Sequence, residues 1–109
     1  MGKIIGIDLG TTLSGVAQVN EHGEPNIIPN AEGELRTPSV IYFADEIVLV
    51  GRDALREAMG NPARAVFNIK RSIGDPDFRF AVDGESYSTE SLSALILLKV
   101  AQDAARQVG

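Results

Sequence analysis

Short apolar runs separated by polar turns fill the first part of the chain and predict a sheet built from hairpins. Two such runs, Lys3–Leu9 and Ser14–Val19, are joined by the tight loop Gly10-Thr11-Thr12. A third short strand, Asn26–Ile28, follows the turn Glu21-His22-Gly23. Apolar runs of this length, bounded by glycine and polar residues, are typical of strands. The pattern therefore predicts an antiparallel three-stranded meander.

A second hairpin is predicted after the polar loop at residues 29–37. Pro38 restricts Thr37 to extended conformations, and the apolar runs Ser39–Phe43 and Ile47–Val50 flank the turn Ala44-Asp45-Glu46. Two segments with helical patterns come next. The first helix is predicted over Arg52–Met59, ending at Gly60-Asn61-Pro62, and the second over Ala63–Ile73, ending at Gly74 with Lys70 near its end.

The last third of the chain predicts a tight hairpin and a long helix. Asp83-Gly84 is a strong signal for a two-residue turn, and it lies between Phe80–Val82 and Glu85–Tyr87. The helix should begin after Ser88 as N-cap and end at Gly109. Its middle, Leu92 through Ala101, is apolar nearly all the way round, so we expect it to be covered on more than one side. Strands that precede helices favour an α+β fold or an α/β unit of a larger domain.

Composition narrows the chemistry. The 109 residues suffice for one small domain, and 44% apolar with 23% charged residues is typical of soluble globular proteins. The formal net charge of -5 disfavours nucleic acid and anionic membrane as partners. The longest apolar run, Ala94–Leu98, is too short to span a bilayer, so we expect a cytoplasmic location. With no cysteine and one histidine, thiol chemistry and histidine-rich metal sites are excluded.

The segment Asp8-Leu9-Gly10-Thr11-Thr12 is the main candidate for chemistry. Gly10 allows a ligand to approach the backbone, amides in a tight turn can bind an anion, and the two threonines add hydroxyl donors. Asp8 would be a hard oxygen ligand for Mg²⁺, directly or through water. The same pentapeptide also fits an Asx-type turn followed by a strand, with no ligand.

Lys70 is a second candidate, in Phe67-Asn68-Ile69-Lys70-Arg71. An ammonium on the inner face of a helix could stabilise charge in a phosphoryl-transfer transition state, whereas a solvated lysine on an amphipathic helix is the alternative. His22 lies in a turn without a partner at metal-ligand spacing, and we interpret it as a surface residue.

Five blocks of sequence follow one another along the chain. They are Ile4-Ile5-Gly6-Ile7-Asp8-Leu9-Gly10-Thr11-Thr12, Asn30-Ala31-Glu32-Gly33 with Thr37-Pro38-Ser39, Leu49-Val50-Gly51, Asn61-Pro62 before Phe67-Asn68-Ile69-Lys70-Arg71-Ser72-Ile73-Gly74, and Ser91-Leu92-Ser93-Ala94-Leu95-Ile96-Leu97. In this order the blocks resemble DnaK-type chaperones of the heat shock protein 70 family, and the match runs the full length of the chain.

The resemblance implies part of the actin-like, ribonuclease-H-like ATPase fold: a β-meander, a small α+β subdomain and a long C-terminal helix. It implies an ATP-dependent chaperone that uses ATP or ADP with Mg²⁺ and works on unfolded polypeptides with a J-domain co-chaperone and a nucleotide exchange factor. Gly10, Thr11 and Thr12, with the adjoining Leu13, would then contact the nucleotide. Asp8 would serve the Mg²⁺ shell through water in its hydration sphere, and Lys70 and Asp8 would be the catalytic residues.

Two departures and the length qualify these implications. Leu13 stands where the family usually has a polar or aromatic residue, and Gly15 where it commonly has cysteine or a small apolar one. We expect residues 1–109 to be an N-terminal fragment of the ATPase domain, without a second lobe or peptide-binding domain, and to be inactive alone. The alternatives are a non-catalytic module that self-associates through exposed apolar surface of its last helix, and another ATPase or kinase of the actin-like superfamily.

Overall fold

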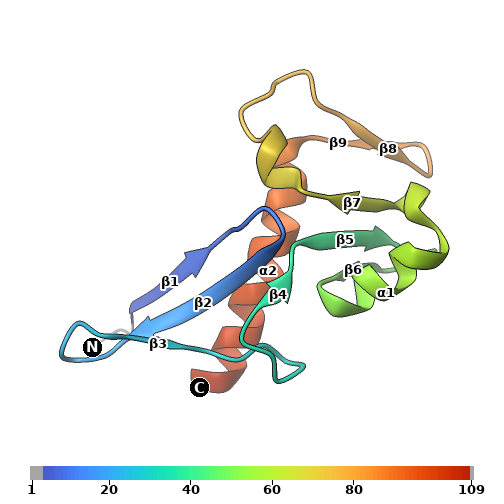
Figure 1. Ribbon diagram of the computed structural model, residues 1–109. Coiled ribbons are helices and arrows are strands. Elements are labelled where there is room, and N and C mark those ends of the chain that lie inside the picture. Colours follow the sequence, from blue (N-terminus) through green and yellow to red (C-terminus); the bar gives the residue numbers. More distant parts are fainter. Residues whose placement is uncertain (1–3, 109) are drawn as a thin grey trace.

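A computed structural model describes residues 4–108 and shows the predicted meander as its first sheet (Figure 1). The central strand β2 (Leu13–Val19) pairs antiparallel with β1 (Ile4–Asp8), with Asp8 opposite Gly15. It also pairs with β3 (Pro25–Ile27) and, at its start, with the short β4 (Thr37–Pro38). The meander is therefore confirmed and extended by β4, while Lys3 lies outside the described residues.

The second sheet is centred on β5 (Val40–Phe43), which lies between β6 (Val48–Val50) and β7 (Ala65–Phe67). Successive side chains of a strand point to opposite faces, and both faces of β5 are covered. On one face, helix α1 (Arg52–Gly60) packs its buried alanines against Val40 and Tyr42. On the other face, Ile41 and Phe43 join a core with Leu92 and Ile96.

The predicted helix over Ala63–Ile73 is wrong. In its place lie a one-turn 3-10 helix η1 (Pro62–Arg64), the strand β7, and a second one-turn 3-10 helix η2 (Ile69–Ser72) that carries Lys70. Between β7 and η2, Asn68 adopts a left-handed conformation with φ of 54°, which no α-helix tolerates. Pairing of β7 with β5 buries Ala65 and Val66, so tertiary packing overrides the local helical pattern.

The short hairpin near the end of the chain is confirmed. Strands β8 (Phe80–Val82) and β9 (Glu85–Tyr87) are joined by Asp83 and Gly84, both with positive φ. Two positive φ values are what the tight two-residue turn requires. The rings of Phe80 and Tyr87 lie 5.7 and 4.7 Å from the ring of Phe43, which fixes the hairpin on the second sheet.

Helix α2 (Thr89–Val108) runs behind both sheets and joins them (Figure 1). Ser88 is its N-cap, because its Oγ accepts a hydrogen bond from the Ser91 amide at 3.2 Å; the predicted cap Gly109 lies outside the described residues. Leu92 and Ile96 pack on the second sheet, and further along α2 Val100 and Ala104 pack on the first.

The expectation that the apolar middle of α2 is covered on more than one side is wrong. Both sheets lie along the same half of the helix, and the opposite half stays exposed within the described residues at Ala94, Leu97, Leu98 and Ala101. The mixed α/β class with a long C-terminal helix is confirmed. Within residues 4–108, no helix is both long and apolar enough to cross a membrane.

Candidate functional site

The loop that joins β1 to β2 has the tight shape that the sequence predicts. Asp8 ends β1, Leu13 begins β2, and residues 9–12 form the connection. A Cβ built on Gly10 would lie 2.0 Å from the carbonyl oxygen of Leu13, far inside van der Waals contact. Only glycine fits at this position with the loop in its present form, so the backbone itself forms this surface.

Ser39, which lies between β4 and β5, anchors the loop. Its amide donates a hydrogen bond to the Thr12 carbonyl at 2.8 Å, and its Oγ donates to the Gly10 carbonyl at 2.9 Å. The hydroxyls of Ser39 and Ser14 lie 2.8 Å apart. Ser39 is only 2% exposed, and hydrogen bonds in such an environment hold their partners in place. The loop is thus held at both ends of its bend.

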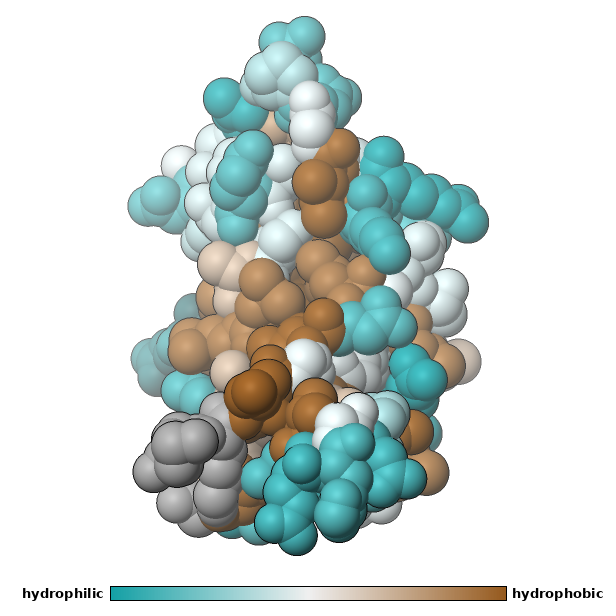
Figure 2. Space-filling model, turned by 90° about the vertical axis from the view of Figure 1, so that its left-hand side faces the viewer, coloured by the Kyte–Doolittle hydropathy of each residue, from teal (hydrophilic) through white to brown (hydrophobic). Residues whose placement is uncertain are grey.

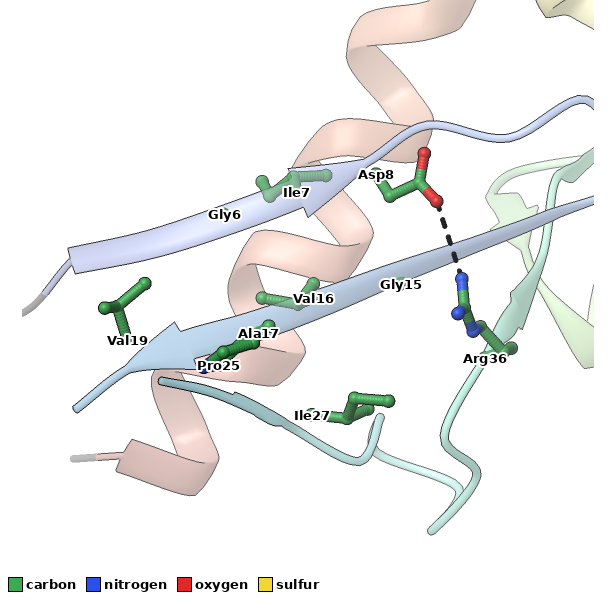
Figure 3. A pocket seen from close by; sticks show the side chains of 10 residues that line it. All are labelled: Gly6, Ile7, Asp8, Gly15, Val16, Ala17, Val19, Pro25, Ile27 and Arg36. Carbon is green, nitrogen blue, oxygen red and sulfur yellow. Dashed lines mark ion pairs between the residues drawn. The ribbon is translucent and has the colours of Figure 1, made fainter. Parts of the chain in front are cut away.

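Asp8 lies at the edge of an apolar hollow on the open face of the first sheet (Figure 3). Its side chain is 69% exposed, and its Oδ2 lies 3.5 Å from Nη1 of Arg36. The hollow encloses about 340 Å³ and is lined mainly by β1, β2 and β3, with Arg36 reaching in from the start of β4. The cationic partner of Asp8 in this structure is therefore a side chain of the same molecule.

A second hollow, of about 220 Å³, brings the loop together with the segment before Lys70. Thr11, Thr12 and Leu13 line one side of it, and Phe67 and Asn68 line another. Lys70 follows two residues later on η2 and is exposed. The structure thus places the lysine segment beside the loop, as a shared site would require, although on a 3-10 turn and not on the predicted helix.

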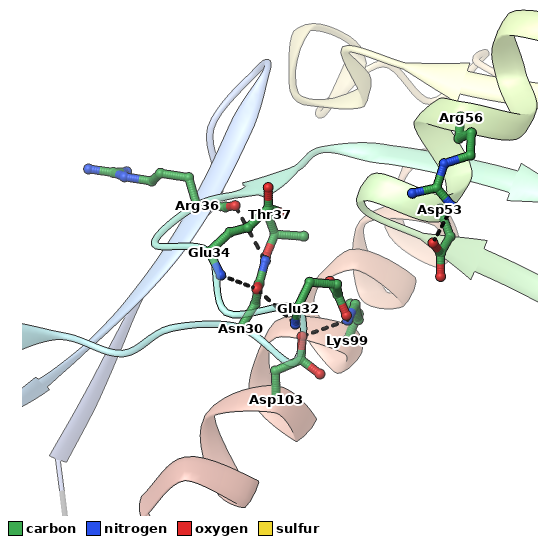
Figure 4. A network of polar contacts seen from close by, with 9 residues as sticks. All are labelled: Asn30, Glu32, Glu34, Arg36, Thr37, Asp53, Arg56, Lys99 and Asp103. Carbon is green, nitrogen blue, oxygen red and sulfur yellow. Dashed lines mark hydrogen bonds and ion pairs between the residues drawn. The ribbon is translucent and has the colours of Figure 1, made fainter.

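Residues 30–36, which carry Arg36 to Asp8, are organised by the side chain of Asn30 (Figure 4). Asn30 is buried; its Oδ1 accepts hydrogen bonds from the amides of Glu32 and Glu34 at 3.1 and 2.8 Å. Its Nδ2 donates to Thr37 Oγ1 at 3.0 Å and to the Arg36 carbonyl at 3.4 Å. This amide therefore fixes the backbone from which the Arg36 side chain extends.

Two ion-pair contacts tie this loop to the helices. Lys99 of α2 contacts Glu32 at 3.0 Å and the buried Asp103 at 2.6 Å (Figure 4). Burial acts to lower the pKa of Lys99, but its hydrogen bonds to Asp103 and Glu32 outweigh burial, so the pKa is raised. Arg52 of α1 pairs with Glu34 and lowers the pKa of that carboxyl, chiefly through their hydrogen bond.

The donors around the loop could hold a magnesium ion in only one way, with most of its waters retained. Within residues 4–108 no three acidic or histidine side chains gather to hold a metal ion. The carboxylate beside the loop is that of Asp8, at the end of β1. Mg²⁺ keeps several waters and is commonly held by one or two carboxylates together with substrate phosphates. Asp8 with the hydroxyl-rich loop suits such a water-bridged, phosphate-bridged ion.

The sequence predicted the loop, but not the residues that hold the loop and Asp8 in place. Ser39 and Asn30 lie within the sequence blocks quoted above, but neither had an assigned role. The signal for Ser39 was a polar residue next to a buried strand, and the signal for Asn30 was a polar residue next to a glycine turn. Arg36 carried no signal, because its partner Asp8 is distant in the sequence and lies on the far side of β2. His22, predicted to be a surface residue, is exposed.

Comparison with known families places the chain beside one of them. The sequence model of the Hsp70 protein family matches residues 4–79, which is more than half of the chain. The matched region contains β1, the loop, Ser39, Arg36 and η2 with Lys70.

Proposed function

The chain belongs to the Hsp70 family, and from this premise we propose that it provides one wall of an ATP-hydrolysing site. The observation that carries the proposal is the loop at Gly10–Thr12, shaped by Gly10 and fixed by Ser39, beside the hollow that it shares with the Lys70 segment. A rigid loop of amides and hydroxyls stabilises phosphate charge without having to reorganise.

In this proposal each residue has a separate role. Gly10, Thr11 and Thr12 bind phosphate oxygens, and Leu13 flanks the nucleotide. Asp8 orients the hydration shell of Mg²⁺, and Lys70 stabilises charge on the γ-phosphate as phosphoryl transfer proceeds. Bound magnesium would supply neutralisation of phosphate charge. The 109 residues alone should bind ATP weakly and not hydrolyse it, because one loop and one carboxylate provide only a few of the contacts that a nucleotide and its Mg²⁺ need.

Titration of the labelled chain with ATP and Mg²⁺, followed by NMR, tests this proposal. We expect weak binding, with amide shifts concentrated at residues 8–13 and 67–71. Asp8→Asn should reduce these shifts, whereas Asp77→Asn, which removes the same charge from the exposed turn after η2, should leave them unchanged. Shifts elsewhere in the chain, or none at millimolar ATP, would count against the site. Micromolar affinity would refute the one-wall interpretation.

The wider role that we propose is that of an ATP-dependent chaperone in the cytoplasm. It would act on unfolded polypeptides together with a J-domain co-chaperone and a nucleotide exchange factor, and family membership is the support for this role. Deleting the coding sequence should raise the aggregated fraction of cellular protein after heat stress. An unchanged aggregated fraction would count against a chaperone role and would leave the nucleotide proposal standing.

A second candidate is self-association, which exposed apolar surface favours. Strand β1 pairs only with β2 among the described residues, and its Ile4, Ile5 and Ile7 are exposed. An apolar area is visible on the side of the molecule that β1 occupies (Figure 2). We expect dimers in sedimentation experiments that Ile5→Lys disrupts. A wild-type monomer that binds no apolar dye would exclude this candidate.

A further inference from the structure

Arg36 reaches Asp8 by crossing the open face of β2 (Figure 3). Its backbone is fixed by the Asn30 amide and by the start of β4 at Thr37. From there the side chain extends into the apolar hollow, and its guanidinium lies 3.5 Å from the carboxylate. Because the backbone of Arg36 is fixed, its contact with Asp8 depends on the path that the Arg36 side chain takes over β2.

Gly15 leaves that path open. It lies directly opposite Asp8 in the pairing of β1 with β2. A Cβ built on Gly15 would lie 3.2 Å from Cδ and 3.3 Å from Nη1 of Arg36, closer than ordinary van der Waals contact. A larger side chain at this position would occupy the space that the arginine now fills. The contact between Arg36 and Asp8 therefore depends on the absence of a side chain at Gly15.

We propose that Arg36 is a built-in cation that competes with the divalent metal for Asp8, and that Gly15 is the residue that permits it. The inference rests on the proposed metal role of Asp8. A guanidinium and a hydrated divalent ion both neutralise the same carboxylate, so each weakens the binding of the other. Arg36 thereby sets the metal concentration at which the ion binds to Asp8. It determines the affinity of the site and is not a catalytic residue.

Binding of Mn²⁺, a paramagnetic probe with the same preference for oxygen ligands, to the 109-residue chain tests the proposal by NMR line broadening. In the wild type, broadening should centre on residues 6–12. Arg36→Gln should lower the dissociation constant by about two- to fivefold, the size expected for an exposed ion pair. Gly15→Val should act in the same direction by displacing the arginine. Asp8→Asn should abolish the local broadening in every background.

Arg56→Gln is the matched control. Arg56 is also exposed and paired with an aspartate, Asp53 at 3.2 Å, but it lies on α1, away from the first sheet (Figure 1). It should leave Mn²⁺ binding unchanged, and amide spectra of all variants should show the native fold. The Nε–H signal of Arg36 gives a second readout, which Asp8→Asn and Gly15→Val should both shift in metal-free protein.

The possible outcomes separate the two proposals. Local broadening that Arg36→Gln leaves unchanged or weakens would overturn the competition and leave the metal role of Asp8 intact. Absence of local broadening in all variants, with the Arg36 signal still responding to Asp8→Asn, would overturn the metal role of Asp8 and the competition with it. An Arg36 signal that ignores both substitutions would show that the ion pair does not form in solution.

Discussion

The backbone at Gly10 passes so close to the Leu13 carbonyl that even a methyl group there would overlap the oxygen. The neighbouring Ser39 is nearly as constrained, because its amide and its hydroxyl both bond to carbonyls of the same loop. Each of these residues supports the loop in a way that can be removed by one substitution. The contribution of each residue to stability and to ligand binding can therefore be measured with single substitutions.

Gly10→Ala should destabilise the protein by about 1–3 kcal/mol, because the loop must distort to relieve the overlap at 2.0 Å. Gly60→Ala at the end of α1 is the control, since a Cβ there meets nothing within 4 Å; alanine in place of a helical glycine should be neutral or stabilising by up to about 1 kcal/mol. Urea denaturation measures both. Equal stability of the two variants would show that the loop relaxes freely.

Ser39→Ala should lower the free energy of unfolding by about 1–3 kcal/mol, because it removes the bond to Gly10 and leaves the buried Ser14 hydroxyl without that partner. It should also weaken any ATP-induced shifts at residues 8–13. Ser86→Ala on the exposed hairpin strand β9 should change stability by less than about 0.5 kcal/mol. A native-like stability for Ser39→Ala would mean that water replaces the lost bonds.

The sequence predicted the residues of the loop but not those that hold it, and the reason is physical. Asp8, Gly10 and the threonines lie within one pentapeptide, so their chemistry is visible in a short window. Ser39 acts through partners 25 and 29 positions away. Arg36 reaches Asp8 across β2, and no local pattern encodes such contacts.

Among the elements, the predictions failed where tertiary pairing competes with local pattern. The hairpin at Asp83-Gly84 was predicted with its bounds because its turn requires positive φ, a local property. Residues 63–73 have helical spacing, but the edge of β5 offers a pairing partner, and Ala65–Phe67 became a strand. The lysine segment thereby reaches the loop through a strand and a 3-10 turn.

The loop at residues 30–36 should make stability depend on pH through Glu34. Its pKa is lowered from an ordinary value of 4.5, chiefly by the hydrogen bond from Arg52. The folded state therefore holds this proton less tightly than the unfolded chain does. The contribution of Glu34 is fully present above the unfolded value and is lost as pH falls through the lower folded-state pKa. Arg64 lowers the pKa of Asp83 in the same direction.

Thermal unfolding measured between about pH 5 and about pH 3 checks this expectation. The midpoint temperature of the wild type should fall with pH, and Glu34→Gln should start lower at pH 5 and fall less steeply. Glu46→Gln, at the exposed turn between β5 and β6, should run parallel to the wild type. A Glu34→Gln curve parallel to the wild type would show that the Arg52 contact does not contribute to folding.

At the scale of the whole molecule, α2 packs against both sheets and should make them unfold as one cooperative unit. Ile96→Ala should lower the free energy of unfolding by about 2–5 kcal/mol, because this side chain is fully buried against the second sheet. Leu98→Ala, 55% exposed on the opposite half of α2, should change it by less than about 0.5 kcal/mol.

Signals from both sheets distinguish a local from a global effect of Ile96→Ala. Amide signals of Val16 in the first sheet and Val66 in the second should disappear at the same urea concentration, below that of the wild type. Loss of the second sheet alone, with Val16 retained, would show that α2 does not couple them.

The shared helix also has a consequence for how the protein is made. Val16 and Ile28 bury their side chains against Val100 and Ala104, which a ribosome adding about 5–20 residues per second supplies several seconds later. Until then the first meander has no apolar partner from α2, so Val16 and Ile28 emerge uncovered. The nascent chain therefore passes through an interval in which it is itself an aggregation-prone polypeptide, and its folding must wait for α2.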